Sequence, residues 1–452
     1  MNTSSKLDDL RNKEVVATNV PIGRMRWFLV FWLFVLGAVS FLDRVNISIA
    51  GTALAEEYHL TQIQLGSIFS AFLIGYALFQ TPGGWLADKL GPRYVLTIGV
   101  AWWGIFTALT ASMSSTAAGA LSYLILIRLL LGAGEAIIYP ASNRFVSQWI
   151  PSQERGLANG LIFAGVGAGT AAAPIFVTYL MLHYGWRSSF WASAILGLVV
   201  GVIWYIAARD VPEEHPLVSQ AELSYIQEFR SPKPANHHPL PEGSLVSSRI
   251  AWRQIVFNRN ILAVTISYFC FGYVAWIFFS WFYIYLAKVR GLDLKASAFY
   301  STLPPLAIVI CSLGGGALSD AMTESYGKRI GRCVLAASAL VLAAIILVVG
   351  SRVVSAPLAS IVLSGGLGAL YLAQSSYWSI TADIGGKNAG LVSGFMNMGC
   401  QFGGALTASL TPIIAQRYGW TSSFLAAAIL SAVGGIAWLL VEPEYRVTPV
   451  EK

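Results

Sequence analysis

Four ionisable side chains of this chain lie inside long apolar stretches, where a charge is expensive. Asp43 and Arg44 are adjacent in the first stretch, and Arg128 and Glu135 are seven residues apart in the fourth. A charge near the middle of a membrane costs at least about 2.5–3.5 kcal/mol, so it normally faces a partner or a water-filled cavity. Cations beside carboxylates suit two kinds of chemistry, the binding of an anion and the carriage of a proton.

Helical geometry predicts how these side chains are directed. Neighbouring residues of a helix point about 100° apart, so we expect one of Asp43 and Arg44 to face the centre of the protein and the other a neighbouring helix. A spacing of seven returns Arg128 and Glu135 to nearly one face, so the proton affinity of Glu135 should depend on where Arg128 lies. The alternative in both cases is a purely structural set of neutralised charges.

Histidine does not offer a proton relay inside the stretches. All five histidines lie in loops or at the ends of stretches, namely His59, His183, His215, His237 and His238. A relay must therefore use carboxylates, chiefly Asp43 and Glu135. The apolar stretches also contain no nucleophile–base pair and no metal-ligand spacing, so we expect neither an enzyme, a metal site nor a cofactor.

The elements that carry these residues are membrane-spanning helices. Hydrophobic residues make up 56% of the 452 residues and charged residues 11%, against about 25% charged residues in a soluble domain. Stretches of about 20 apolar residues, long enough to cross a bilayer, recur along the chain. They lie near 27–49, 64–87, 95–114, 121–143, 155–181, 189–207, 261–287, 298–319, 333–350, 355–380, 388–414 and 421–440. We therefore predict an all-α membrane protein with twelve transmembrane helices.

An internal repeat divides these helices into two sets. The segment 184–190, YGWRSSF, returns as YGWTSSF at 418–424, and Gly156 pairs with Gly390 at the same offset of 234 residues. A duplicated apolar chain of this length indicates two pseudo-symmetric six-helix bundles of a transporter.

Charge and proline content set the expected domain limits. We predict a tail at 1–26, a first bundle at 27–207, a linker at 208–260 with a short helix around 218–229, a second bundle at 261–440, and a tail at 441–452. If the N-terminus is cytoplasmic, 21 of the 29 basic residues face the cytoplasm and six face the other side. This bias places both termini in the cytoplasm. It also accounts for the net charge of +7 through contact with membrane lipids, without nucleic acid.

Two loops echo each other at the ends of the second and eighth stretches. The first reads GWLADKLGPR and contains Asp88 and Arg93, and the second reads GGALSD and ends at Asp320. This pattern resembles the signature loop of the major facilitator superfamily. The resemblance implies that Asp88, Arg93 and Asp320 form a latch between the bundles on the cytoplasmic side. The alternative is a glycine-rich turn that only joins helices.

The charged residues resemble one branch of that superfamily, the anion–cation symporters. The resemblance rests on Asp43-Arg44, on Tyr76 within GYA, on Arg128 with Glu135, on QSSYWS at 374–379 and on GFMN at 394–397. It implies substrate contacts from Arg44, Tyr76, Ser375, Tyr377, Trp378 and Asn397, and proton coupling through Asp43 and Glu135 with Arg128. The sequence departs from the galactonate carrier of that branch at Phe41 and in the tract LIFA at 161–164, so we expect fewer hydrogen bonds in the first half of the pocket.

The expected function is a proton-coupled symporter that imports an organic anion, most of all a sugar acid such as an aldonate, aldarate or hexuronate. We expect a monomer in the inner membrane of a bacterium. Alternatives are a carrier of dicarboxylates or aromatic acids and a non-transporting nutrient sensor. An organic-phosphate antiporter would need a second cation in the seventh stretch, where none precedes Lys288, and a drug exporter would need Gly-Pro in the fifth.

Overall fold

The computed structural model describes residues 23–113, 119–229, 255, 257–282, 285–292 and 294–444. Its first half begins with a helix that starts at Met25, two residues before the predicted bundle. The helices of this half are α2 (Met25–Glu57), α3 (Gln62–Leu90), α4 (Pro92–Ser112), α5 (Ala120–Glu135), α6 (Ile138–Trp149), α7 (Arg155–Tyr184) and α8 (Trp186–Ala207).

The second half repeats this plan after a short connecting region. That region contains the turn η1 (Pro212–Glu214) and α9 (Gln220–Phe229), which confirms the short helix predicted around 218–229. The second half comprises α11 (Arg259–Ser280), η2 (Tyr285–Val289), α13 (Leu294–Ser301), α14 (Leu303–Tyr326), η3 (Arg329–Val334), α15 (Leu335–Arg352), α16 (Ala356–Leu372), α17 (Gln374–Gly385), η4 (Gly386–Asn388), α18 (Ala389–Tyr418) and α19 (Trp420–Leu439).

The helices account for the predicted twelve spans. Within the described residues, ten helical runs are long and apolar enough to cross a membrane. One run, Ala356–Tyr418, contains two spans, because α16 with α17 forms one and α18 forms the next. The remaining span is α3, a helix of 29 residues that is not among the ten runs. The predicted fold class, twelve helices in two six-helix bundles, is therefore confirmed.

The two halves pack by the same rules. Helix α2 packs against α7 in the first half as α11 packs against α18 in the second, and the α4–α8 contact corresponds to α15–α19. The repeated YGW segments form equivalent turns, in which Gly185 has a φ of 79° and Gly419 a φ of 83°. This left-handed backbone ends α7 and α18 and favours glycine, because a side chain would be strained there. The repeat in the sequence thus marks a repeat in the backbone.

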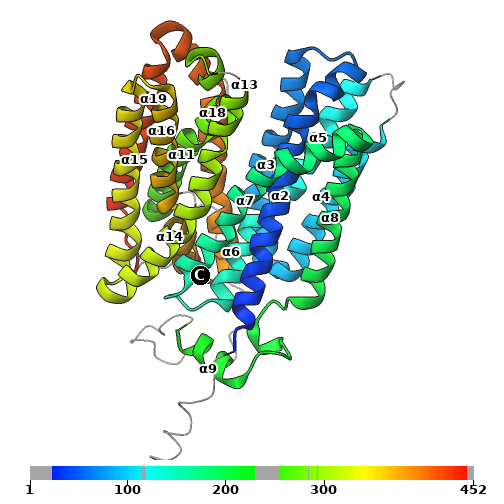
Figure 1. Cartoon of the computed structure of the whole chain (residues 1–452). Helices are drawn as coiled ribbons and strands as arrows, with labels where there is room; N and C mark the ends of the chain where they lie inside the picture. The colour runs from blue at the N-terminus through cyan, green and yellow to red at the C-terminus, as the bar shows by residue number, and fades with distance from the viewer. Residues whose placement is uncertain are drawn as a thin grey trace, which may run out of the picture.

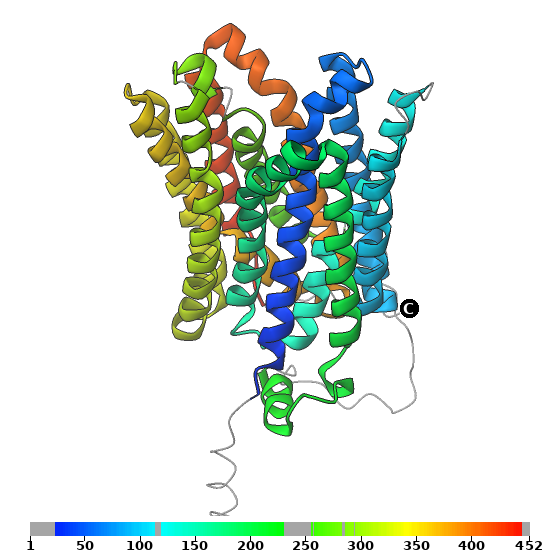
Figure 2. The ribbon, with the colours of Figure 1, turned by 45° about the vertical axis from the view of Figure 1, so that its right-hand side comes forward.

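The halves touch each other at one end of the molecule. We call the end at which α2 begins and α9 lies the α9 face (Figures 1 and 2). Helix α3 packs against α18, and α7 against α14, so closely that a Cβ at Gly84 would overlap the carbonyl oxygen of Gly390. A Cβ at Gly316 would overlap the carbonyl oxygen of Gly156 in the same way. Toward the opposite end the two bundles lean apart (Figure 1).

Helix α9 is fastened to the start of α2 by a buried carboxylate. Glu222 accepts hydrogen bonds from the backbone amides of Met25 (3.3 Å) and Arg26 (3.1 Å), which are free because they begin a helix. The Arg26 guanidinium also pairs with Glu154, just before α7, at 2.9 Å. Burial and the neighbouring Glu154 carboxylate raise the pKa of Tyr225 on α9 to about 12.

Candidate functional site

A break in one membrane span places a carboxylate among the buried charges. Helix α5 ends at Glu135 and α6 begins at Ile138. Pro140 has no amide hydrogen, so the carbonyl of Ala136 loses its helical partner, and the helix is interrupted there. The fully buried Glu135 accepts hydrogen bonds from Ser40 and from the Arg44 guanidinium, both on α2. The Arg44 to Glu135 distance is 2.8 Å.

Aromatic rings enclose the Arg44 guanidinium. Its central carbon lies 4.3 Å from the ring centre of Phe41, 4.5 Å from that of Tyr76 and 5.2 Å from that of Phe72. Cation–π attraction of this kind is stronger where water is excluded. The Nε–H of Arg44 has no hydrogen-bond partner among the described residues. Arg44 is therefore held in place while one donor is still available.

The Asp43 carboxylate contacts α4, whereas the next residue, Arg44, contacts Glu135 on α5. Its Oδ2 accepts a hydrogen bond of 2.8 Å from Thr107 on α4, and its Oδ1 has no partner among the described residues. Arg128 is buried against the ring of Phe72 at 4.9 Å and makes no ion pair within the described part of the chain. The structure thus pairs Glu135 with Arg44 of α2. It does not pair Glu135 with Arg128, although Arg128 and Glu135 lie on the same helix, α5.

These four side chains form a balanced set of charges. Two cations, Arg44 and Arg128, and two carboxylates, Asp43 and Glu135, are each about nine-tenths buried or more. Their formal charges sum to zero when all are ionised. An anion entering beside Arg44 would leave one uncompensated negative charge, which is costly away from water. A proton on either carboxylate would restore the balance.

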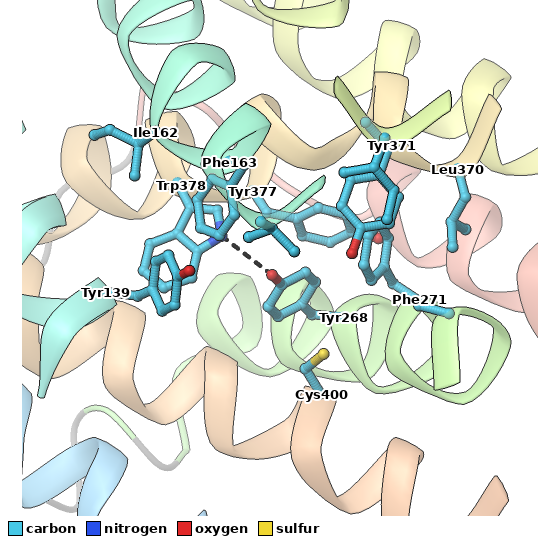
Figure 3. Packing of buried hydrophobic residues seen from close by; sticks show 14 of the residues in the cluster. Tyr139, Ile162, Phe163, Tyr268, Phe271, Leu370, Tyr371, Tyr377, Trp378 and Cys400 are labelled. Atoms are coloured by element: carbon cyan, nitrogen blue, oxygen red, sulfur yellow. Dashed lines mark hydrogen bonds between the residues drawn. The ribbon is translucent and has the colours of Figure 1, made fainter. Parts of the chain in front are cut away.

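The expected site residues of the second half lie on α17 and α18. Helix α17 begins directly after Ala373, at a break equivalent to that after Glu135. Tyr377 hydrogen-bonds to Ser267 (2.6 Å), and the indole of Trp378 donates to the Tyr268 hydroxyl (3.1 Å; Figure 3). The hydroxyl of Ser375 is buried without a partner among the described residues. The Tyr377 hydroxyl and the Trp378 indole are therefore engaged within the second half, whereas the Ser375 hydroxyl is available.

An aromatic stack joins the two halves beside these residues. Tyr139 of α6 stacks on Phe163 of α7 with ring centres 4.9 Å apart, and Phe163 contacts Trp378 of α17 at the same distance (Figure 3). The Tyr139 hydroxyl is buried without a hydrogen-bond partner in the described structure. Sequence reasoning missed Tyr139, although it lies one helical turn beyond Glu135.

The carboxylates of the two echoing loops cross between the halves. Asp88, near the end of α3, accepts from the amides of Gly390 (3.0 Å) and Leu391 (2.8 Å), which begin α18. Asp320, on α14, accepts from the amides of Gly156 (2.8 Å) and Leu157, which begin α7. Negative charge is favourable at a helix N-terminus, so each carboxylate stabilises contact between the halves.

The arginines near these loops have unequal roles. Arg93 stays within the first half, where its side chain donates to the Tyr205 carbonyl (3.0 Å) and its backbone amide to Asp210 (2.8 Å). The cation beside Asp88 is instead Arg144 of α6, at 3.6 Å. In the second loop, Arg332 pairs with Asp320 at 2.8 Å.

A further ion-pair network on the α9 face escaped the sequence analysis. The buried Asp383 of α17 pairs with Arg155, the first residue of α7, and with Lys328 at 3.2 Å. The Asp383–Arg155 ion pair joins the two halves. The internal repeat gave no signal for it, because the residue equivalent to Arg155 at the offset of 234 is Ala389. Among the described residues, no group of three or more His, Cys, Asp or Glu side chains is placed to hold a metal ion.

Two related helical bundles that enclose buried charges are typical of membrane transporters. The chain belongs to the major facilitator superfamily, whose family model matches residues 33–408. Among solved structures, the xylose–proton symporter XylE shares the fold with a TM-score of 0.69 at 15% identity, over 90% of this chain and 94% of that chain. The fucose transporter FucP in an outward conformation matches with a TM-score of 0.64 at 17% identity, over 90% and 97%.

Curated relatives are transporters of anions. The probable sulfoacetate transporter SauU of Cupriavidus necator is 32% identical over 92% of this chain and 93% of its own length. The probable galactarate/D-glucarate transporter GudP of Bacillus subtilis is 29% identical over 95% and 94%. The chloroplastic ascorbate transporter of Arabidopsis thaliana is 30% identical over 92% and 74%. These relatives match the resemblance to anion–cation symporters, and the chain is a transporter, not an enzyme.

Proposed function

We propose that this chain is a proton-coupled symporter that imports an organic anion, with sugar acids (aldonates, aldarates or hexuronates) as the leading substrate class. The observation that carries the proposal is the Arg44 guanidinium, which is buried, enclosed by aromatic rings, and paired with Glu135 while its Nε–H stays free. A guanidinium fork suits a carboxylate. Relatives named for galactarate, glucarate, ascorbate and sulfoacetate support an acid as substrate.

The proton coupling follows from the charge balance. A monoanion bound at Arg44 competes with Glu135 for the same cation, and protonation of Glu135 relieves that competition. Asp43 is the second proton carrier in this proposal, since it is buried and has one free carboxylate oxygen. Arg128 is the cation that changes its distance to these carboxylates during transport.

The proposed orientation places the α9 face and both termini in the cytoplasm of a bacterium, with the protein a monomer in its inner membrane. The basic residues support this, because six of them lie toward the opposite side: Arg187, Lys288, Arg290, Lys295, Arg352 and Arg417. The structure is then outward-facing, since the halves are in contact on the α9 face. The expected domains at 1–26, 27–207, 208–260, 261–440 and 441–452 are kept as part of the proposal.

Uptake into proteoliposomes tests the function. The full chain is reconstituted and supplied with labelled aldonates, aldarates, hexuronates, sulfoacetate, dicarboxylates and aromatic acids, with and without an inward proton gradient. We expect one class to accumulate above its outside concentration only when the proton gradient is present. Accumulation driven only by sodium, or no uptake of any organic anion, would contradict the proposal. Accumulation of dicarboxylates or aromatic acids alone would correct the substrate class.

A further inference from the structure

A second buried donor lies one helical turn from Tyr76, whose ring contacts Arg44. Gln80 is on α3, one helical turn beyond Tyr76, and its side chain is fully buried. Its Oε1 accepts a hydrogen bond of 3.0 Å from the amide of Asn397 on α18. Its Nε2 makes no well-formed hydrogen bond among the described residues, although it lies close enough to the Tyr76 hydroxyl to interact with it. A buried amide donor without a partner costs about 1–3 kcal/mol, and a hydrogen bond to a bound ligand is one way to recover that cost.

Close packing of α3 against α18 and the hydrogen bond to Asn397 fix the position of the Gln80 side-chain amide. Helices α3 and α18 cross here so closely that a Cβ at Gly394 would lie 2.5 Å from the Gln80 carbonyl oxygen. Gln80 therefore stands where the two halves meet, between Tyr76 of the first half and Asn397 of the second. Its Oε1 is already occupied, so the Asn397 bond fixes the direction of its free NH₂ group.

We infer that Gln80 is a specificity-determining residue, whose NH₂ group donates a hydrogen bond to an acceptor oxygen of the anion other than the carboxylate held by Arg44. The inference rests on the proposed function. The substrate class is thereby narrowed to acids with a second oxygen near the carboxylate, such as a hydroxyl group or a further acidic group. Gln80 also positions Asn397, and the two roles are separable by substitution.

Two substitutions of Gln80 separate the roles. Gln80→Glu keeps an acceptor for Asn397 but replaces the free NH₂ by a carboxylate oxygen, whereas Gln80→Met removes both functions at similar size. Thr81→Val is the matched control, because Thr81 lies at the same helix crossing and its hydroxyl donates a weak hydrogen bond to the sulfur of Met398 (3.8 Å). Each variant is first checked for monodisperse folding and for its melting temperature.

The measurement is the KM for exchange in proteoliposomes. The probes are the best-transported acid of the panel and analogues of it, each lacking one non-carboxylate oxygen. A site that hydrogen-bonds an oxygen rejects the analogue lacking it, so we expect the wild type and Thr81→Val to prefer the acid over one analogue by about tenfold or more. Gln80→Met should transport the parent acid and that analogue with the same KM. Gln80→Glu should have a higher KM for the parent acid than the wild type.

The outcomes distinguish this inference from the proposed function. If the wild type discriminates and Gln80→Met keeps the same discrimination, Gln80 does not touch the substrate and the inference is wrong, while the function stands. If Gln80→Glu keeps the wild-type KM while Gln80→Met is defective, Gln80 only positions Asn397. That result would also overturn the inference. If Gln80→Met does not fold, Gln80→Glu alone decides, through its KM for the parent acid. Failure of the wild type to transport any organic anion would refute both.

Discussion

Asp88 and Asp320 make the same contact in opposite directions. Asp88 reaches from the first half to the amides that begin α18, and Asp320 reaches from the second half to the amides that begin α7. The two carboxylates are 232 residues apart, close to the repeat offset of 234. The contact between the halves is therefore doubled by the pseudo-symmetry of the fold. We propose that the two contacts form a latch, and that both break when the α9 face opens.

Neutralising either carboxylate should shift the protein toward the state that is open on the α9 face. A hydrogen bond to a charged group contributes about 1.5–3 kcal/mol, so we expect Asp88→Asn and Asp320→Asn each to change the ratio of the two states about tenfold or more. Turnover should fall, while substrate affinity changes less, because the latch lies outside the proposed pocket. Spin-label distances across the α9 face measure the populations.

Asp210→Asn is the control for the latch. Asp210 also accepts from a backbone amide, that of Arg93, but this contact does not reach the second half. Asp210→Asn should therefore leave the spin-label distances across the α9 face unchanged. Wild-type distances and transport rates in both Asp88→Asn and Asp320→Asn would show that these loops act as plain turns.

Replacing Arg44 should weaken binding of the transported anion. Lysine keeps the charge but loses the fork that can hold a carboxylate with two hydrogen bonds, and it fits the aromatic enclosure less well. We expect Arg44→Lys to raise the Kd by about tenfold, and Arg44→Ala by more, because it also leaves Glu135 without its cation. Calorimetry on the purified protein provides the measurement. An unchanged Kd in Arg44→Ala would place the anchor elsewhere.

The sequence predicted the helices because runs of apolar residues specify spans locally. It also predicted the two bundles, because the YGW segments recur at a fixed offset. The pairing of Glu135 was not predictable in this way. Helical spacing pointed to Arg128 on the same helix, whereas the packing of α2 against the broken span brings Arg44 within 2.8 Å. Arg93 was expected in the latch on the strength of a motif, but Arg144 occupies the place beside Asp88.

An ion pair at the face opposite α9 should make the free energy of unfolding depend on pH. Glu57, at the end of α2, forms two hydrogen bonds with Arg187 at 2.6 and 2.7 Å. The Arg187 guanidinium holds the pKa of Glu57 below its ordinary value of 4.5. Since the folded pKa is the lower one, the contact stabilises the protein above that ordinary value and is lost as the pH falls through the folded pKa. We expect about 0.2–1 kcal/mol, because both side chains are partly exposed.

Melting temperatures test this sign directly. At pH 7, Glu57→Gln in detergent should melt below the wild type, and the difference should shrink as the pH is lowered below 4.5. Salt should weaken the difference as well. A difference that stays constant from pH 7 to pH 3.5 would mean that the Glu57 charge makes no contribution.

Glutamine at position 135 should separate binding from energy coupling. It resembles a protonated Glu135 in shape and charge, and it frees the Arg44 guanidinium from its 2.8 Å ion pair. We therefore expect Glu135→Gln to bind the anion at least as well as the wild type and to exchange it across the membrane. Accumulation driven by a pH gradient should be lost, because the residue no longer takes up or releases a proton as the halves move.

Exchange and accumulation are measured on the same Glu135→Gln proteoliposomes, so the exchange assay serves as the folding control. Asp43→Asn is tested in parallel, since Asp43 is the other buried carboxylate of the cluster. If both variants still concentrated the anion against its gradient when only a pH difference was supplied, neither carboxylate would couple transport to protons. A sodium-coupled or uncoupled carrier would then explain the buried charges better, with Arg44 still available to hold the anion.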